Sequence, residues 1–225
     1  MVRKTKEEAE ATREGILDAA ELCFLQYGVF RTTLEHIAAR AGHTRGAVYW
    51  HFKNKLEVLQ AVIDRVTVPL FSGLEAMARE TEQPLAALRR FHKEALDEIA
   101  RTPHARNTIE ITLLRCEFAE ETKEVFEHGQ RSAATAVAHM TEALRRAQKL
   151  GHLRQGVDPA TAALALHFLI NGALRDWVLN PTRVCVQKEG MAALDLLLEG
   201  IAVEGALDGA AARKIAPVRR ATKAG

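Results

Sequence analysis

The side chains best equipped to bind another molecule lie close together in residues 44–55, which have the sequence TRGAVYWHFKNK. Thr44 is a helix-capping residue type, and the spacing predicts a short helix over residues 45–51. Ala47 and Val48 suit the inner side of that helix. The side chains left to face outward are Arg45, Tyr49, Trp50 and His51. Two large adjacent rings cannot both be buried on so short a helix, so this face offers donors and rings to a partner.

A second short helix is predicted just before it, from the segment TTLEHIAARAG at residues 32–42. Thr32 and Thr33 can each cap this helix, and Glu35 follows Thr32 at the spacing of a capping box. Gly42 then ends the helix, because glycine enters the left-handed conformation most easily. Helix, glycine turn and helix in this order are typical of a helix-turn-helix motif, whose second helix enters the major groove of DNA.

The charge of the surrounding segment favours the same interpretation. Residues 31–60 hold five basic and two acidic side chains, whereas the whole chain has 31 basic and 29 acidic ones. A local positive patch is the footprint expected of a surface that faces phosphates. A plain helical hairpin with solvated charges, the alternative, does not explain the adjacent rings. The predicted DNA-binding residues are Thr33, Thr44, Arg45, Tyr49, Trp50, His51 and Lys55, with Arg45 at a base edge and Thr33, Tyr49, His51 and Lys55 at phosphates.

No enzyme signature accompanies this motif. The sequence contains no GxxxxGK loop, no GxSxG elbow, no HExxH pair and no glycine-rich dinucleotide turn. The spacing of His36, His43 and His51 does not place all three on one helix face, so we predict no metal, no cofactor and no catalytic residue. The alternative hypothesis is a small-molecule-binding or enzymatic helical protein whose N-terminal hairpin is an interaction module.

Composition favours an all-α soluble protein. The 225 residues are 48% hydrophobic, 27% charged and 5% aromatic, and Ala and Leu abound while β-branched runs are absent. Three isolated cysteines indicate a reducing compartment. The N-terminus has no apolar run of signal-peptide length, and the apolar stretch at residues 160–174 is too short to cross a bilayer. We therefore expect a cytoplasmic protein without membrane contact.

Helix signals divide the chain into two domains and a tail. Apolar spacing and the positions of Gly and Pro predict further helices over residues 6–27, 55 to 69 or a little beyond, 84–102, 121–150, 159–180 and 188–203, with a short one after Pro103. We predict a three-helix DNA-binding domain of residues 1–54 and a larger helical ligand-binding and dimerisation domain of residues 55–205. Residues 206–225 have almost no large apolar side chains, which predicts a disordered tail.

The predicted helix at residues 159–180 carries polar side chains on an otherwise apolar side. His167, Asn171 and Arg175 are four residues apart, so they share one side of the helix. Burying such groups is costly unless they find partners. The spacing leaves two interpretations open: they pair across a subunit interface, or they orient a ligand in a pocket. A surplus of apolar residues also predicts a homodimer, namely Leu164, Phe168, Ala173, Leu194, Leu197, Leu198 and Ile201.

Three segments resemble the TetR family of bacterial transcriptional regulators, and within it the AcrR and TtgR branch that represses multidrug efflux pumps. They are MVRKTKEEAEATREGILDAA at the N-terminus, RTTLEHIAARAGHTRGAVYWHFKNK at residues 31–55 and IEITLLRCEFAEE at residues 109–121. Asn171-Gly172 and Trp177 follow in the expected order. The resemblance extends to about residue 205. It implies a homodimeric repressor that binds palindromic operator DNA near an efflux operon and is released by a small-molecule effector.

The resemblance also implies where the effector binds. Carried over position by position, the wall residues are Val66, Leu70, Ile109, Leu113, His167, Ile170, Asn171 and Arg175. Ile109 and Leu113 are apolar where polar residues are common in the branch, so we expect a more apolar cavity that accepts amphipathic, aromatic compounds. In the mechanism that the resemblance implies, the ligand shifts the helix at residues 55–70 and alters the spacing of two recognition helices.

Overall fold

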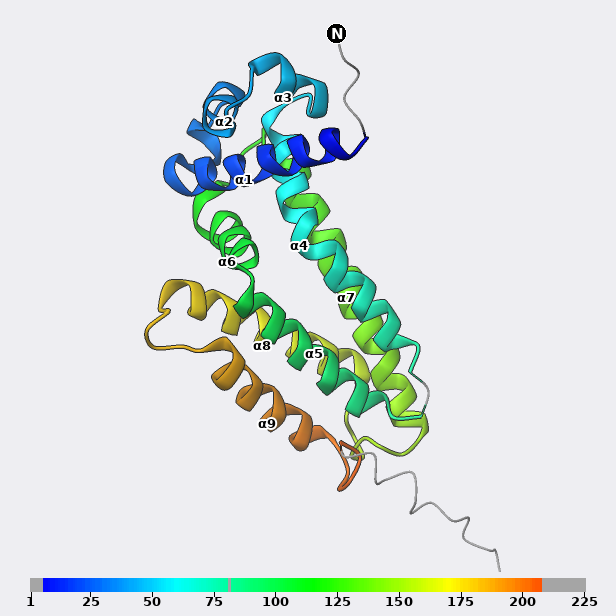
Figure 1. Ribbon diagram of the computed structural model, residues 1–225. Helices are drawn as coiled ribbons and strands as arrows, with labels where there is room; N and C mark the ends of the chain where they lie inside the picture. Colours follow the sequence, from blue (N-terminus) through cyan, green and yellow to red (C-terminus); the bar gives the residue numbers. More distant parts are fainter. Residues whose placement is uncertain (1–5, 81, 208–225) are drawn as a thin grey trace, which may run out of the picture.

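The prediction of an all-α fold is confirmed. This computed structural model describes residues 6–80 and 82–207, and within them there is no strand and a single β-bridge, between Leu153 and Ala202. Figure 1 shows α1 to α3 grouped at one end and the other helices forming a larger body below them. The elements are α1 Lys6–Arg31, α2 Leu34–Ala41, α3 Arg45–His51, α4 Lys55–Ala78, α5 Pro84–Arg101, α6 Pro103–Glu110, the π-helical turn η1 Ile111–Arg115, α7 Lys123–Lys149, α8 Pro159–Leu179, the π-helical turn η2 Val186–Gly190 and α9 Met191–Ile201.

The N-terminal group has a hydrophobic core of its own. Its buried members include Ile16, Phe24, Ile37, Val48, Val62 and Ile111. Val62 belongs to α4 and Ile111 to η1, so the core that supports α2 and α3 extends beyond residue 54. The position of the recognition helix therefore depends on α4 and on the segment after α6.

The turn between α1 and α2 departs from the sequence prediction. Gly28 has φ +78° and interrupts α1, where the first helix was expected to stop. Thr33 is the N-cap of α2, and its hydroxyl accepts a hydrogen bond from the N–H of His36. Thr32 is buried, and its hydroxyl donates to the Gly28 carbonyl at 2.7 Å. The predicted capping box of Thr32 and Glu35 is therefore wrong, because Thr33 occupies the N-cap position and Thr32 belongs to the preceding turn.

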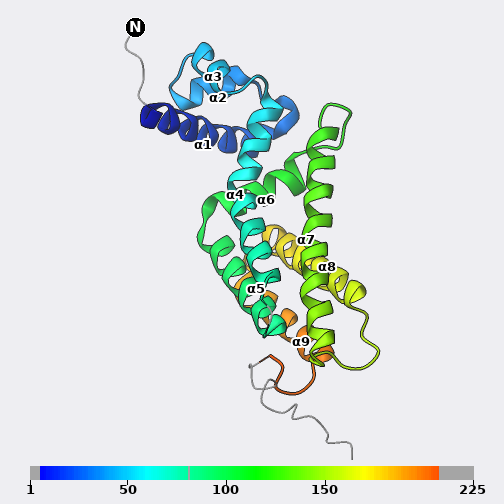
Figure 2. The ribbon, with the colours of Figure 1, turned by 90° about the vertical axis from the view of Figure 1, so that its right-hand side faces the viewer.

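Asn54 and Glu57 close the start of α4 in the manner of a capping box. The side-chain oxygen of Asn54 accepts from the N–H of Glu57 at 2.9 Å, and the Glu57 carboxylate accepts from the N–H of Lys53 at 2.7 Å. The helix then continues through Pro69 to Ala78 and is longer than predicted. It lies beside α7 along most of its length, and the two helices run in the same direction (Figures 1 and 2). This packing holds α4 together despite the backbone donor that Pro69 lacks.

The larger body is built around a second hydrophobic core from α4, α5, α7, α8 and α9. Its most deeply buried side chains include Leu85, Leu88, Leu96, Leu144, Leu166 and Leu194. The last helix is shorter than predicted because η2 precedes it. Ala206 is also buried in this core, so the predicted tail does not begin at residue 206. Residues 208–225, the rest of that tail, lie outside the described residues.

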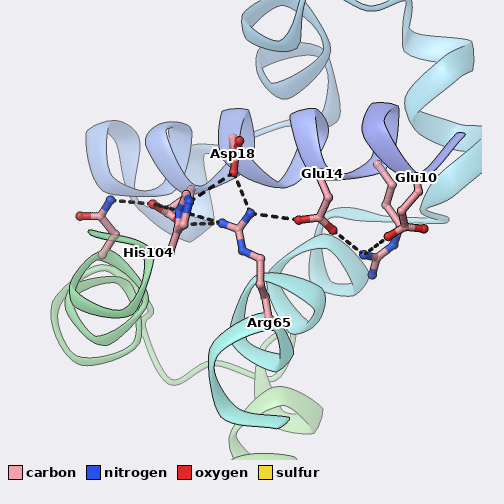
Figure 3. A network of polar contacts seen from close by, with 8 residues as sticks. Glu10, Glu14, Asp18, Arg65 and His104 are labelled. Carbon is pink, nitrogen blue, oxygen red and sulfur yellow. Dashed lines mark hydrogen bonds and ion pairs between the residues drawn. The ribbon is translucent and has the colours of Figure 1, made fainter. Parts of the chain in front are cut away.

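A network of charged side chains joins α1 to α4 and α6 (Figure 3). Arg65 of α4 donates from its terminal nitrogens to Asp18 and Glu21 of α1, both at 2.7 Å. Glu21 is 2% exposed, accepts from Asn107 of α6 at 2.6 Å and lies 3.0 Å from Nδ1 of His104. Burial disfavours the charged guanidinium, but the hydrogen bond to Asp18 and the charge of Glu21 raise the pKa of Arg65. The cation therefore persists and holds three helices together.

Replacing Arg65 by Met should destabilise the fold, because Glu21 would then be buried without its cation. We expect the free energy of unfolding to fall by about 3 kcal/mol, the lower end of the range for a broken buried pair, since Asn107 still donates to Glu21. Urea denaturation measures this change. The matched control is Arg79→Met, which removes an exposed pair with Glu75 at the end of the same helix and should cost less than about 1 kcal/mol. Equal losses in the two variants would contradict this role of Arg65.

Candidate nucleic-acid interface and ligand cavity

Helix α3 presents the exposed face that the sequence predicted. Val48 is completely buried beneath it, whereas Trp50 is 73% exposed and Tyr49 is 44% exposed. Thr44 caps the helix by accepting a hydrogen bond from the backbone three residues on, at 3.2 Å. The rings of Trp50 and His51 meet edge to face with 4.5 Å between their centroids. Rings, a hydroxyl and a guanidinium thus gather on one short, exposed helix.

Arg45 is oriented by contacts on both sides. Its guanidinium lies 2.8 Å from the Glu35 carboxylate on α2, donates to the Tyr49 hydroxyl at 3.1 Å and stacks on the Tyr49 ring. The hydrogen bond to Tyr49 and the charge of Glu35 raise the pKa of Arg45. An arginine held in this way stays charged, and its guanidinium is shared between Glu35 and Tyr49.

Thr33 and Lys55, two of the predicted phosphate contacts, lie in different surroundings. Thr33 is exposed at the start of α2. The Lys55 ammonium donates to the Phe30 carbonyl at 2.8 Å and lies 3.3 Å from the Glu121 carboxylate, and its side chain is only 18% exposed. In this conformation Lys55 therefore joins α4 to the end of α1 and to the loop before α7.

A cavity of about 170 Å³ lies between α4, α5, α7 and α8. Its apolar wall includes Leu70, Phe71, Leu74, Phe91, Leu96, Ile99, Met140, Ile170 and Leu174. Its polar side chains are Thr67, His92, His167 and Asn171. A mostly apolar wall with a few polar groups is the usual composition of a site for a small molecule.

The predicted wall residues do not all meet at this cavity. Those that line it are Leu70, His167, Ile170 and Asn171. The Asn171 amide donates to the His167 carbonyl at 2.8 Å, so this side chain lies along its own helix. Val66 lines a neighbouring cavity of about 150 Å³. Neither cavity is lined by Ile109, Leu113 or Arg175, and the last two are exposed.

Helix α8 separates Arg175 from the cavity. Arg175 is exposed on the same outer face as Leu164, Phe168 and Leu179, and Phe168 is 67% exposed. The apolar stretch was expected to be too short to span a bilayer, but the helix around it has 21 residues and is the one described helix that could do so by length and composition. Such a helix equally suits a soluble protein in which a second subunit covers the apolar outer face.

His92 of α5 is a candidate site residue that the sequence analysis did not identify. It lines the cavity and is buried, and its Nδ1 lies 2.8 Å from the Leu88 carbonyl. Nδ1 therefore donates to that carbonyl, and Nε2 is left as an acceptor. Burial lowers the pKa of His92, although the hydrogen bond to Leu88 opposes this. A neutral imidazole in an apolar wall can accept a hydrogen bond from a ligand hydroxyl.

The lowered pKa of His92 predicts that the protein loses stability in acid. Because the pKa in the folded state lies below its ordinary value of 6.5, the unfolded chain takes up a proton more readily as the pH falls below that value. Burial lowers the pKa of His152 as well, which acts in the same direction. His92→Gln should therefore show a smaller drop in melting temperature between about pH 7.5 and about pH 5.5 than the wild type. His36→Gln, at an exposed position, is the control, and an equal drop in all three proteins would contradict the assignment.

A helix-turn-helix with an exposed recognition helix, joined by one long helix to a helical body with an apolar cavity, defines a ligand-responsive DNA-binding regulator. Family models agree with this class. Residues 16–62 match the model for bacterial regulatory proteins of the tetR family, and residues 83–202 match the C-terminal region of MAATS-type transcriptional repressors. The chain belongs to the TetR family, whose members are transcriptional regulators and not enzymes.

Individual relatives are similar over most of the chain. The HTH-type transcriptional regulator TtgR of Pseudomonas putida is 38% identical over 82% of this chain and 88% of its own length. The structure of a SmeT–triclosan complex is 44% identical with a TM-score of 0.80, covering 87% of this chain and 94% of that one. NalD, the secondary repressor of the MexAB-OprM multidrug efflux pump in Pseudomonas aeruginosa, is 33% identical with a TM-score of 0.79, covering 88% of this chain and all of the other.

Proposed function

We propose that this protein is a homodimeric repressor of a multidrug efflux operon, which leaves palindromic operator DNA when small amphipathic or aromatic compounds bind its larger domain. The observation that carries the proposal is the course of α4. This helix begins at Lys55, next to the DNA-binding helices, and reaches the cavity at Thr67 and Leu70. Similar proteins repress efflux pumps, and one of them has been solved with triclosan. We place the protein in the cytoplasm, where a soluble regulator meets DNA.

The DNA-binding residues follow from the exposed face of α3 and its surroundings. Arg45 reaches a base edge, where a guanine offers two acceptors to a guanidinium. The DNA phosphates are bound by Thr33, Tyr49, His51 and Lys55, and these contacts fix the register of the protein on the DNA. Thr44 and Trp50 lie beside them. Lys55 binds a phosphate in place of the Glu121 carboxylate, which is its partner in the present conformation. One recognition helix reads few bases, so two copies are needed for affinity.

The outer faces of α8 and α9 form the dimer interface in this proposal. Phe168 on α8 and Leu196 on α9 are 67% and 75% exposed, which is unusual for large apolar side chains unless a partner covers them. Leu197, named from the sequence as an interface residue, is half-buried against the core of its own chain. The dimer places its recognition helices about 34–36 Å apart, or near a multiple of that spacing.

The effector occupies the cavity between α4, α5, α7 and α8. His92, His167 and Asn171 provide its few hydrogen bonds, and apolar side chains provide most of its contacts. Ile109, Leu113 and Arg175 lie away from it in this conformation. Ligand binding favours a state in which α4 is displaced, and repression ends because the two recognition helices no longer match the operator.

DNA fragments that flank the gene of this protein test the function directly. The wild type should bind one of them, as measured by fluorescence anisotropy, and binding to none would overturn the proposal. Arg45→Ala should lower operator affinity by about tenfold to a hundredfold and relax base preference at one position of each half-site. Arg79→Ala, far from α3, is the control. Unchanged base preference in Arg45→Ala would remove Arg45 from the base-reading role.

Asn171 and Arg175 provide a matched test of the effector site, because they are one helical turn apart. Asn171→Ala should weaken the binding of two-ring aromatic compounds by about fivefold, the net value of one hydrogen bond, and Arg175→Ala should not. Calorimetry measures ligand affinity, and anisotropy measures operator binding without ligand. Loss of operator binding in Asn171→Ala, with ligand affinity retained, would assign Asn171 to the subunit interface.

A further inference from the structure

Glu35 is the one acidic side chain among residues 32–52, which include both helices of the helix-turn-helix. It lies in the first turn of α2, and half of its side chain is exposed. Glu57, the other acidic side chain of residues 31–60, accepts the N–H of Lys53 and so closes the start of α4. Glu35 lies instead beside the recognition helix, and the DNA contacts proposed above leave it without a role.

The Glu35 carboxylate touches the residue that is expected to read a base. One of its oxygens lies 2.8 Å from a terminal nitrogen of Arg45, the first residue of α3. The N-terminal residues of a recognition helix are the ones that contact base edges in the major groove. The Arg45 and Glu35 side chains are 62% and 50% exposed, so DNA can approach both. A carboxylate in contact with Arg45 is therefore within reach of the same base edges.

The charge of Glu35 needs a donor when DNA is bound. Hydrogen bonds from its own backbone N–H and from Thr33 lower the pKa of Glu35, so the carboxylate is ionised at neutral pH. Beside DNA phosphates and shielded from water, such a charge costs binding free energy unless it is hydrogen-bonded. Arg45 supplies one donor, but a guanine that offers two acceptors to Arg45 competes for the same guanidinium. A donor on the DNA itself would offset this cost.

Hydrogen-bond chemistry in the major groove singles out cytosine as the source of that donor. Of the four bases, only cytosine and adenine present an amino group there, at N4 and N6. Adenine also presents the acceptor N7 next to its amino group, which repels a carboxylate, whereas cytosine presents its donor alone. A carboxylate has about four acceptor positions. The backbone N–H of Glu35, Thr33 and Arg45 use three of them, and the remaining position suits one cytosine.

We propose that Glu35 accepts a hydrogen bond from N4 of a cytosine in the base pair next to the guanine that Arg45 reads. The inference rests on the proposed function, because it adds a second base to the same recognition surface. The 2.8 Å between carboxylate and guanidinium is close to the spacing of about 3.4 Å between stacked bases, so the two side chains stay in contact while they read neighbouring pairs. Each half-site therefore contains two adjacent G·C pairs.

A randomised library of DNA duplexes tests this assignment without knowledge of the operator. The full-length protein selects duplexes from the library, and sequencing of the bound fraction gives the preferred base at each position of a half-site. Two adjacent G·C pairs are expected for the wild type, and loss of preference in Arg45→Ala identifies the guanine. In Glu35→Gln the neighbouring cytosine should be replaced by adenine with a preference of about tenfold, because an amide donates to N7 of adenine while it accepts from N6. Glu35→Ala should lose the preference at that position.

The position of the change distinguishes a base contact from support of Arg45. If Glu35 only orients Arg45, both variants at residue 35 lose preference at the guanine and at no other position, and this result would overturn the assignment. A cytosine preference that survives in both variants would overturn it as well. Melting curves verify that the variants are folded, which is expected because the Glu35 side chain is half exposed.

Glu121→Gln is the matched control, because it removes the same charge from a carboxylate 3.3 Å from Lys55. Freeing Lys55 for a phosphate should strengthen binding to all duplexes severalfold and leave the selected sequence unchanged. Fluorescence anisotropy with the selected duplex and with a scrambled one measures the two affinities. A change of base preference in Glu121→Gln as large as that in Glu35→Gln would show that loss of charge alone alters the preference, and would overturn the role of Glu35.

The same selection separates this inference from the proposed function. A wild type that enriches no sequence from the library would refute sequence-specific DNA binding and with it the proposed function. A wild type that enriches a two-fold symmetric sequence, which the variants at residue 35 select unchanged, would refute the role of Glu35 and leave the repressor function standing.

Discussion

Arg65 and Glu21 form an ion pair that is almost closed to water where three helices meet. Burying a carboxylate as deeply as Glu21 is costly unless hydrogen-bond partners surround it, and these partners come from α4 and α6: Arg65, Asn107 and His104. Helix α1 cannot separate from α4 without leaving the Glu21 carboxylate without its cation. Because α2 and α3 share a core with α1, the position of the DNA-binding helices is tied to the positions of α4 and α6.

The same constraint explains why a cavity in the larger body can affect DNA binding. Helix α4 contributes Val58 and Val62 to the N-terminal core and Leu74 and Met77 to the second core. The residues between them line the two cavities. A rigid helix fixed at both ends in this way has few alternative positions, and a ligand that fits one position better than another shifts the population between them. Coupling between the cavities and the DNA-binding helices then requires only the packing of α4 and the Arg65 network.

The helix-turn-helix could be predicted from the sequence because its signals are local. Thr44, Gly42 and Asn54 act within four residues of their own positions, and the structure places each at the predicted helix end. Even so, Thr32 and Thr33 could not be distinguished as caps, since the choice depends on the turn at Gly28. Glu21 and Arg65 are 44 residues apart and carry no motif, so their pairing appears only once the helices are packed. The sequence analysis missed His92 for a similar reason, because its spacing fits a core position as well as it fits a cavity wall.

Helix α8 shows where spacing alone fails. A four-residue interval places Asn171 and Arg175 about 40° apart around the helix, so the prediction of a shared side was sound. The cavity, however, takes in His167, Ile170, Asn171 and Leu174, and the outer face takes in Phe168, Arg175 and Leu179. The boundary between the cavity side and the outer face of the helix therefore lies within the 40° that separates Asn171 from Arg175. The larger cavity is thus left without a guanidinium, and its polar groups are amide, hydroxyl and imidazole side chains. Since apolar contacts distinguish similar ligands poorly, a wall of this kind favours broad selectivity among uncharged aromatic compounds.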